Sequence, residues 1–163
     1  MKLFFAQFIL NLFIALLWLL FKDEPTPTLA TFNTGFIVGM GILYVMHRFF
    51  GTQFYLIRLA KIIKLVLFFF RELIISGFVV MKQVLTPNLN ITPGIFKYKT
   101  ILEKDWEVTT LSLLLTLTPG SVVMEVSESG DELYIHAMDI GQKEDLIRSL
   151  GRFETVILEV SRD

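Results

Sequence analysis

The sequence predicts a protein with an α-helical membrane region at its N-terminus and a small soluble α+β domain at its C-terminus. Its mean hydropathy is +0.61 and 53% of its 163 residues are hydrophobic, which is too apolar for a soluble domain alone. The longest apolar runs lie before Thr86, and shorter helix and strand patterns follow. The charge changes sign near the same point. Residues 1–93 carry eight Lys/Arg and three Asp/Glu, whereas residues 94–163 carry seven and thirteen.

This pattern divides the chain into four predicted parts. They are a hydrophobic hairpin of two membrane helices, a long basic amphipathic helix, a linker and a cytoplasmic α+β domain, at residues 1–50, 51–86, 87–94 and 95–163. The first apolar run, Leu3–Phe21, approaches the ~20 residues that cross a bilayer. Charged residues rather than a small-residue cleavage site follow it, which favours a retained helix over a signal peptide. Gln7 and Asn11 share one face of this helix and predict a hydrogen bond between helices.

The second apolar segment, Phe32–Met46, follows the polar loop Lys22–Thr31 and completes the hairpin. It contains Gly35 and Gly39, which are about one helical turn apart. Small residues at this spacing let another helix backbone approach closely. Close packing, inside the hairpin or against a partner, is therefore favoured over a role in ligand binding.

The stretch Phe54–Thr86 predicts one long helix, because it contains no proline and a single glycine. At about 100° per residue its charged side chains share an arc of roughly 140°, opposite Leu, Ile, Val and Phe. They are Arg58, Lys61, Lys64, Arg71, Glu72 and Lys82. The helix can lie along a membrane surface, or cross the bilayer with these charges facing partner subunits. We favour two other spans with a surface-lying or partner-packed third helix, in which Lys64, Arg71 and Glu72 contact partner subunits or lipid headgroups.

The position of the C-terminal domain depends on this helix. Arg48 and Arg58 follow the second apolar segment, whereas the first loop has a net charge of −1. The positive-inside rule therefore places the first loop outside the cell and the next linker inside. If the long helix lies on the inner surface the domain is cytoplasmic, and if the helix crosses the bilayer the domain is outside. Three crossings with the domain inside would leave the basic linker outside.

The C-terminal part consists of short alternating elements that follow a linker rich in Pro and Asn. The predicted order is strand, helix, strand, strand, helix, strand, at Ile95–Thr100, Trp106–Leu117, Ser121–Ser127, Glu132–Met138, Gln142–Phe153 and Glu154–Val160. This βαββαβ order is the ferredoxin-like arrangement, in which two helices cover one face of a four-stranded sheet.

Alternation along the predicted strands separates a helix-covered face from an open face. The covered face is predicted to hold Val122, Met124, Val126, Leu133, Ile135, Ala137, Val156, Leu158 and Val160. The open face carries Tyr134, His136 and Met138, with Glu125, Ser127 and Ile157. This is a candidate docking surface, although an ordinary half-polar sheet face explains the same pattern.

The segment Leu111–Leu117 (LSLLLTL) is apolar on all sides and is followed by Thr118, Pro119 and Gly120. A helix that is apolar all round must be buried on several faces. Its outer side is therefore expected to rest on the membrane or on another protein. The Thr-Pro-Gly sequence ends the helix and turns the chain into the next strand.

The residues offer little chemistry. There is no phosphate-binding loop, metalloprotease motif or nucleophile elbow. The chain has no cysteine, and its two histidines, His47 and His136, fall in different parts. We therefore predict no catalytic residue, no cofactor and no metal site. The acidic C-terminal half argues against nucleic acid as a partner, because phosphate contacts need a basic surface.

Three stretches resemble the E subunit of the Mrp-type multisubunit cation/proton antiporters. They are TLTPGSVVMEVSESGDELYIHAMDI, FYLIRLAKIIKLVLFFFRELIISG and PGIFKY, at Thr116–Ile140, Phe54–Gly77 and Pro93–Tyr98. The TLTPG turn and the LYIHAMD strand are the specific parts. The resemblance implies an accessory subunit of the bacterial plasma membrane, needed for assembly or full activity and without catalytic residues of its own.

The resemblance also implies partners and a process. Such complexes exchange cytoplasmic Na⁺ or a similar monovalent cation for external protons, and support sodium tolerance and pH homeostasis. The expected partners are the other subunits of the complex, which carry the Na⁺ and H⁺, and membrane lipid.

The sequence is also compatible with a protein of another functional class. In that alternative, a free-standing, membrane-anchored regulatory protein senses a small ligand on the open face of a ferredoxin-like domain. A membrane-tethered RNA binder of the same fold is disfavoured by the acidic balance and by the lack of stacking aromatics on adjacent central strands.

Overall fold

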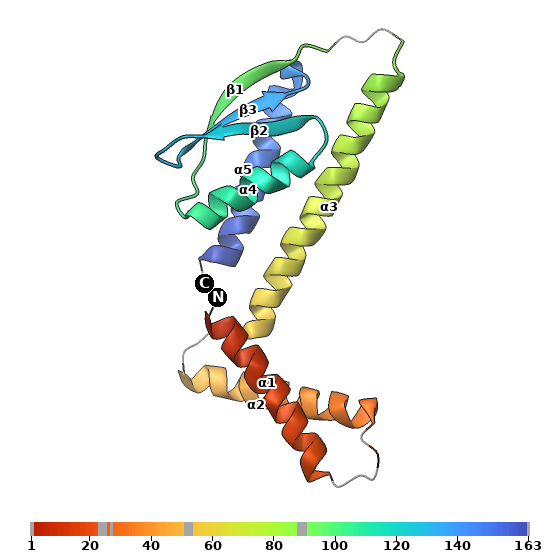
Figure 1. The fold of residues 1–163 in the computed structure, drawn as a ribbon, viewed down its shortest axis with the longest axis vertical. Helices are drawn as coiled ribbons and strands as arrows, with labels where there is room; N and C mark the ends of the chain where they lie inside the picture. The colour runs from red at the N-terminus through yellow and green to blue at the C-terminus, as the bar shows by residue number, and fades with distance from the viewer. Residues whose placement is uncertain (1, 23–25, 27, 51–53, 88–90, 163) are drawn as a thin grey trace. The chain divides into compact units, whose positions relative to one another are not determined.

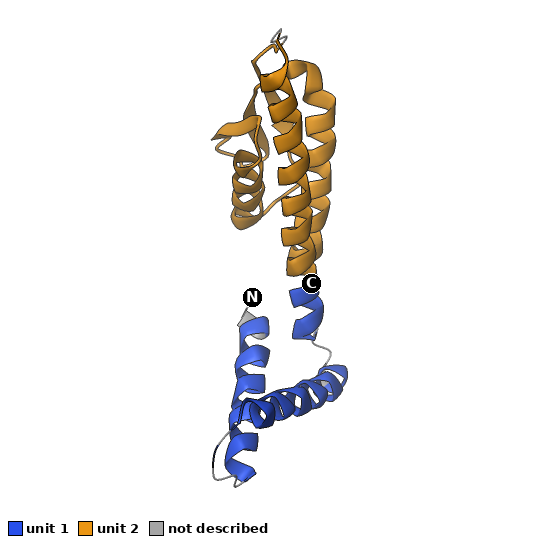
Figure 2. Cartoon of the chain, turned by 90° about the vertical axis from the view of Figure 1, so that its right-hand side faces the viewer, with its two compact units in different colours: residues 1–60 blue, residues 61–163 orange. Residues whose placement is uncertain are grey.

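The computed structural model describes most of the chain, namely residues 2–22, 26, 28–50, 54–87 and 91–162. The chain divides into two compact units, Met1–Ala60 and Lys61–Asp163, which Figure 2 colours separately. The boundary falls within the long helix α3 (Tyr55–Leu85), so its first turns belong to unit 1 and the remainder to unit 2.

Unit 1 consists of α1 (Lys2–Phe21), α2 (Leu29–Phe50) and the beginning of α3. Both α1 and α2 have the length and apolar composition to cross a membrane, over Phe4–Phe21 and Leu29–Phe49. Many of their large apolar side chains are exposed, as expected for helices whose solvent is lipid. The helical N-terminal region that the sequence predicted is confirmed.

Unit 2 joins the rest of α3 to a small α+β fold, drawn in Figure 1. Its further elements are β1 (Gly94–Lys99), α4 (Asp105–Leu117), β2 (Ser121–Val126), β3 (Glu132–Ala137), the 3₁₀ turn η1 (Ile140–Gln142) and α5 (Lys143–Ser161). The strands form an antiparallel sheet in the order β1-β3-β2. Helices α4 and α5 lie against one face of this sheet, and α3 packs on the same core.

The strand predicted at Glu154–Val160 is wrong, because these residues form the second half of α5. The described residues therefore follow the order βαββα, and the ferredoxin-like arrangement with a fourth strand is not present among them. Helical burial explains the difference. Leu150, Phe153, Ile157 and Val160 are buried at spacings of three or four residues, which places them on one side of a helix. Ile157, predicted to face outward, is fully buried.

The alternation predicted for β3 is confirmed, since Leu133, Ile135 and Ala137 are all buried. The alternation predicted for β2 is wrong in its first half. Val123 lies opposite Ile135 and packs on the core, and Val122 lies opposite His136 on the other face.

A β-bulge in β2 explains this shift. The register changes between Val123 and Glu125, so that Val126 again lies opposite Leu133. Met124, predicted to be covered, is 61% exposed at the bulge.

Candidate functional site

The two glycines of α2 lie where α1 approaches most tightly. A Cβ added to Gly35 would lie 2.7 Å from the Cβ of Trp18, and one added to Gly39 would clash with the side-chain oxygen of Asn11. Both glycines are buried. Within unit 1, the close backbone approach that the sequence suggested is therefore made between α1 and α2.

Two polar side chains of α1 hold the beginning of α3. The Asn11 Nδ2 donates to the Tyr55 hydroxyl oxygen at 2.8 Å, and the Tyr55 backbone N–H donates to the Gln7 Oε1 at 2.9 Å. Asn11 is fully buried and Tyr55 is 2% exposed. The hydrogen bonding between helices that the spacing of Gln7 and Asn11 predicted is confirmed. Such bonds contribute about 0.6–2 kcal/mol each in an apolar environment.

In unit 2, charged residues of α3 face α5. The Lys64 Nζ lies 2.8 Å and 2.7 Å from the two carboxylate oxygens of Glu159. The Glu72 carboxylate accepts hydrogen bonds from the Arg71 guanidinium and the Ser149 hydroxyl, each at 3.0 Å. Its side chain is only 12% exposed, whereas that of Arg71 is 58% exposed. Two of the three charged candidates on α3 thus bind α5 directly, and Arg71 pairs with Glu72.

Apolar contacts accompany these polar ones. The rings of Phe68 on α3 and Phe153 on α5 meet edge to face, with centroids 5.0 Å apart and an interplanar angle of 78°. Leu65 and Phe69 also pack against the core of unit 2. The side of α3 that carries Glu72 is therefore the side that packs on the α+β fold.

The opposite side of α3 is a continuous apolar surface, which we term the α3 stripe. All of its members are more than one-third exposed: Ile63, Val66, Leu67, Phe70, Ile74, Phe78, Met81, Val84 and Leu85. At about 100° per residue they share an arc of roughly 120°. From the first member to the last, the stripe is about 33 Å long at 1.5 Å per residue.

A cavity of about 160 Å³ lies between α3 and the α+β fold, beside Glu72. The Thr-Pro-Gly turn, Met138 and Asp139 line it together with polar residues of α3 and α5, including Ser76, Gln83 and Ser149. Gly120 has φ +98°, and a Cβ there would lie 3.3 Å from Val80 of α3, so the turn needs glycine for its backbone and for the approach of α3. Sequence candidates Thr118, Pro119, Gly120 and Met138 are thus brought together with Glu72.

Tyr134 and His136 lie elsewhere, on the face of the sheet opposite the core. His136 is paired with Ile95 on β1 and Val122 on β2, and Tyr134 is paired with Lys97 and Glu125. The Lys97 ammonium lies 5.7 Å from the Tyr134 ring centroid, a cation–π distance. Met138, which was predicted to share this face, lines the cavity instead. Among the described residues, no three His, Asp or Glu side chains gather as a metal site.

Comparison with known proteins identifies the family. The sequence matches the family described as "MNHE: Na+/H+ ion antiporter subunit" over residues 11–160. The chain belongs to this antiporter subunit family. It is 51% identical over 157 residues to the E subunit of a Na(+)/H(+) antiporter from Bacillus subtilis (strain 168), covering 96% of this chain and 98% of that protein.

Two solved structures are similar to this antiporter subunit. One is a chain of the "Mrp complex from Dietzia sp. DQ12-45-1b", 32% identical, with 60% of this chain and 92% of that chain covered and a TM-score of 0.45. The other belongs to the "membrane-bound sulfane sulfur reductase (MBS), an archaeal respiratory membrane complex". It is 23% identical over 93% of this chain and 98% of that chain, with a TM-score of 0.52, and it shares the fold.

Sequence reasoning missed two buried carboxylates of the antiporter subunit. Glu154, placed in the strand that does not form, is 3% exposed and accepts hydrogen bonds from the Tyr98 hydroxyl, the Thr100 hydroxyl and the Ile101 backbone N–H at 2.8, 2.6 and 3.1 Å. It fastens α5 to the end of β1. Burial and the Glu154 carboxylate raise the pKa of Tyr98 well above its usual range.

Glu107 is the second of these carboxylates and is 1% exposed. Burial would raise its pKa. The Ser161 hydroxyl, the Lys104 and Glu103 backbone N–H groups and the Lys104 side chain donate to it, and these bonds lower its pKa overall. Glu107 lies at position N3 of α4, where its carboxylate accepts from the backbone N–H groups just before the helix, which is the acidic half of a capping box. Nothing in the sequence indicated its contact with the end of α5.

Proposed function

We propose that this chain is a non-catalytic accessory subunit that anchors and organises its partners at the bacterial plasma membrane. As a member of its family it is a component of a multisubunit Na⁺/H⁺ antiporter, and its partners are other subunits of that complex. In the proposed role, α1 and α2 span the membrane and α3 carries the α+β fold along the cytoplasmic surface. Ion translocation belongs to the partner subunits.

The packing of α3 is the observation that carries this proposal. One side of α3 contacts α5 through Lys64 and Glu72 and approaches the Thr-Pro-Gly turn at Val80, and the opposite side is the α3 stripe. If this part of α3 crossed the bilayer, the exposed charges of α5, such as Arg148 and Arg152, would be drawn into hydrocarbon. Each would cost about 2.5–3.5 kcal/mol at the centre of a spanning helix. A helix on the surface instead buries the stripe and leaves the fold in water.

The same contacts argue against a role for Arg71 and Glu72 in ion transfer. Charges inside a membrane tend to mark ion pathways. Here Glu72 has partners in unit 2, the Arg71 guanidinium and the Ser149 hydroxyl. Its carboxylate is therefore assigned to holding α3 on α5.

The proposed surface position of α3 has a consequence for the side of the membrane on which the α+β fold lies. Arg48 lies in the last turn of α2, and Arg58 and Lys61 lie in the first turns of α3, which favours the cytoplasmic side for the segment that joins these helices. Since α3 does not cross, unit 2 stays on that side. The alternative of a free-standing ligand sensor is less well supported, because the chain belongs to a family of antiporter subunits and is 51% identical to one of them over nearly its full length.

Single cysteines in this cysteine-free chain test the arrangement. We would place them at Thr26, Thr52 and Ser129 in the full chain and label intact cells with a membrane-impermeant thiol reagent. The expected result is labelling at Thr26 only, with all three labelled after permeabilisation as the control. Labelling of Ser129 from outside would contradict a cytoplasmic α+β fold.

Variants of the charged pair test the structural role of Glu72 and Arg71. Glu72→Ala and Arg71→Ala should lower the amount of assembled complex. Transport per assembled complex should stay unchanged. Either variant abolishing transport in a fully assembled complex would overturn the assignment.

A further inference from the structure

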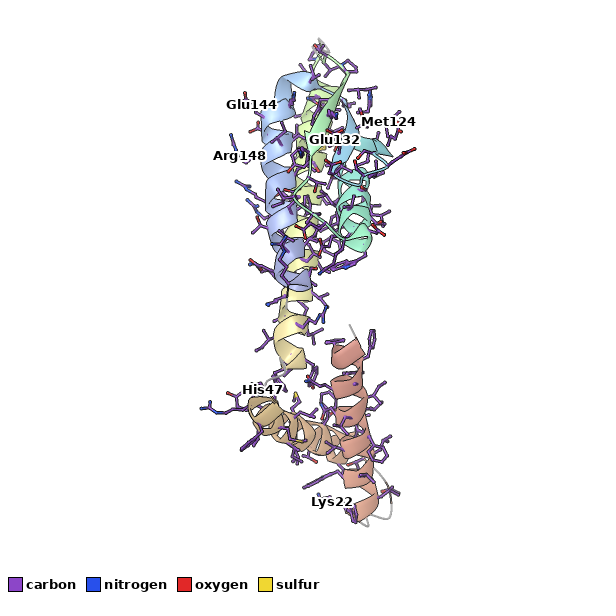
Figure 3. All side chains as sticks on the ribbon, turned by 90° about the vertical axis from the view of Figure 1, so that its left-hand side faces the viewer. Lys22, His47, Met124, Glu132, Glu144 and Arg148 are labelled. Atoms are coloured by element: carbon purple, nitrogen blue, oxygen red, sulfur yellow. The ribbon has the colours of Figure 1, made fainter. Side chains whose placement is uncertain are left out.

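An open groove runs between α4 and the β2–β3 hairpin, with a volume of about 790 Å³. Its surface is partly apolar, since Leu113, Met124 and Val126 line it and are 58%, 61% and 38% exposed. The opposite side of α4 is filled, because Leu111 and Leu115 are buried in the core. The groove is thus the uncovered side of the helix that the sequence showed to be apolar all round. In Figure 3, Met124 lies on the other side of unit 2 from Arg148 of α5.

Acidic side chains surround this apolar surface. Five carboxylates line the groove and no Lys, Arg or His does: Glu103, Asp105, Glu125, Glu128 and Asp131. Two cations lie close to the groove: Lys99 is 3.9 Å from the Asp131 carboxylate, and Lys104, between Glu103 and Asp105 in the chain, pairs with the buried Glu107 at 3.4 Å. A groove of this charge repels the anionic inner leaflet of a membrane, which attracts basic segments. It is complementary to a segment that is both apolar and cationic.

We propose that this groove binds a cationic amphipathic helix of a partner protein. The α4 residues that line it, from Asp105 to Thr116, extend over roughly 18 Å at 1.5 Å per residue, enough for about three turns of a bound helix. A helix laid in such a groove buries one apolar face and leaves its basic residues to meet the carboxylates. This site goes beyond the accessory role proposed above, and it does not depend on where α3 lies.

An added β-strand fits this groove less well than a helix. β2 is one of the two edge strands of the sheet, and an exposed edge can pair with a peptide. Here a β-bulge interrupts β2 at Met124, and the Val123 N–H donates to the Thr116 hydroxyl at 3.4 Å. The edge is therefore distorted and partly occupied, so side chains rather than main-chain groups are available for recognition.

Photo-crosslinking in the assembled membrane complex tests the proposal directly. A photoreactive phenylalanine analogue would replace Met124 or Leu113 in the full chain, and Ile147 on α5 would carry the control probe. The crosslinked peptide is then sequenced by mass spectrometry. The expected product at Met124 and Leu113 is a segment of another protein with net positive charge and apolar residues at helical spacing. Ile147 should not give this product.

A charge-reversal variant provides a second test of the groove. The Glu125→Lys/Glu128→Lys variant should lower the yield of the groove crosslink by at least about tenfold, since attraction becomes repulsion. Glu144→Lys, on the exposed beginning of α5 and outside the groove, is the matched control and should leave the yield unchanged. Co-purification of the complex with the tagged chain, scored separately, reports the accessory role.

Several results would overturn the groove assignment while leaving the accessory role intact. They are a crosslink to lipid, to a second copy of this chain or to a neutral or acidic segment, no crosslink in a complex that co-purifies, and an unchanged yield in the charge-reversed variant. Loss of co-purification in the unmodified chain would instead refute the accessory role.

Discussion

Replacing Glu154 tests how the α+β fold is held together. Its carboxylate is buried and receives three hydrogen bonds, from the Tyr98 hydroxyl, the Thr100 hydroxyl and the Ile101 N–H. Glu154→Ala removes every acceptor and leaves these donors without a partner. An unsatisfied buried donor costs about 1–3 kcal/mol, so a total loss of about 3–6 kcal/mol is expected.

Glu154→Gln should cost less. The amide oxygen can still accept from Thr100 and Ile101, and the Tyr98 hydroxyl can turn from donor to acceptor and receive the amide N–H. The bonds lose the assistance of the charge, which is worth about 1 kcal/mol for each bond. The burial cost of the carboxylate also disappears. We therefore expect a loss of about 1–3 kcal/mol, clearly smaller than that of the alanine variant.

The assay is urea unfolding of the full chain in detergent micelles, followed by tryptophan fluorescence. The chain has two tryptophans, Trp18 and Trp106. All variants would therefore also carry Trp18→Phe, so that the fluorescence comes from Trp106 in α4 alone. With a slope of about 1.5 kcal/mol per M, a loss of 3 kcal/mol moves the midpoint by about 2 M.

The matched control for this experiment is Glu144, an exposed residue in the first turn of the same helix. Its alanine variant should lose less than about 1 kcal/mol, from the helix dipole alone. If Glu154→Ala lost no more stability than Glu144→Ala, or no more than Glu154→Gln, the role assigned to the three bonds would be refuted.

Three further changes probe other contacts. Gly39→Ala should lower the thermal stability of unit 1 by about 1–3 kcal/mol through overpacking against Asn11, whereas Gly41→Ala, which meets no atom within 4 Å, should be neutral in the same melting experiment. Phe68→Ala should destabilise unit 2 by about 2–4 kcal/mol in urea, and Phe70→Ala, on the exposed α3 stripe, should leave the urea midpoint unchanged. The lowered pKa of Glu107 stabilises the fold above its unfolded pKa of about 4.3, and this contribution is lost as the pH falls through the lower, folded value. Glu107→Gln should therefore flatten the dependence of the urea midpoint on pH from about pH 5 downward, and an unchanged slope in that range would contradict it.

The sequence predicted the elements whose pattern is long or strictly periodic. Two apolar runs and one charged amphipathic stretch were sufficient for α1, α2 and α3, and the alternation of Leu133, Ile135 and Ala137 placed β3 correctly. Small residues at Gly35 and Gly39 likewise indicated close helix packing, because this constraint is local.

The errors arose where distant contacts decide the structure. The segment Glu154–Val160 is rich in β-branched residues and reads as a strand, but its burial against the core follows the helical period. The bulge at Met124 changes which residues of β2 face the core. Strict alternation along the sequence does not reveal such an extra residue. The cavity beside Glu72 could not be predicted at all, because residues from α3, the Thr-Pro-Gly turn and α5 meet only in the fold.

The two halves of the sequence carry opposite net charges, which suit different surroundings. Residues 1–93 carry a net charge of +5, and on α3 basic residues such as Arg71 and Lys82 flank the apolar stripe. Each Lys or Arg near an anionic leaflet contributes about 1 kcal/mol of attraction. Residues 94–163 carry −6, so the same leaflet repels them. In the proposed arrangement, an acidic fold beside an anionic leaflet turns its apolar groove away from lipid, which is consistent with the cationic protein segment proposed for the groove.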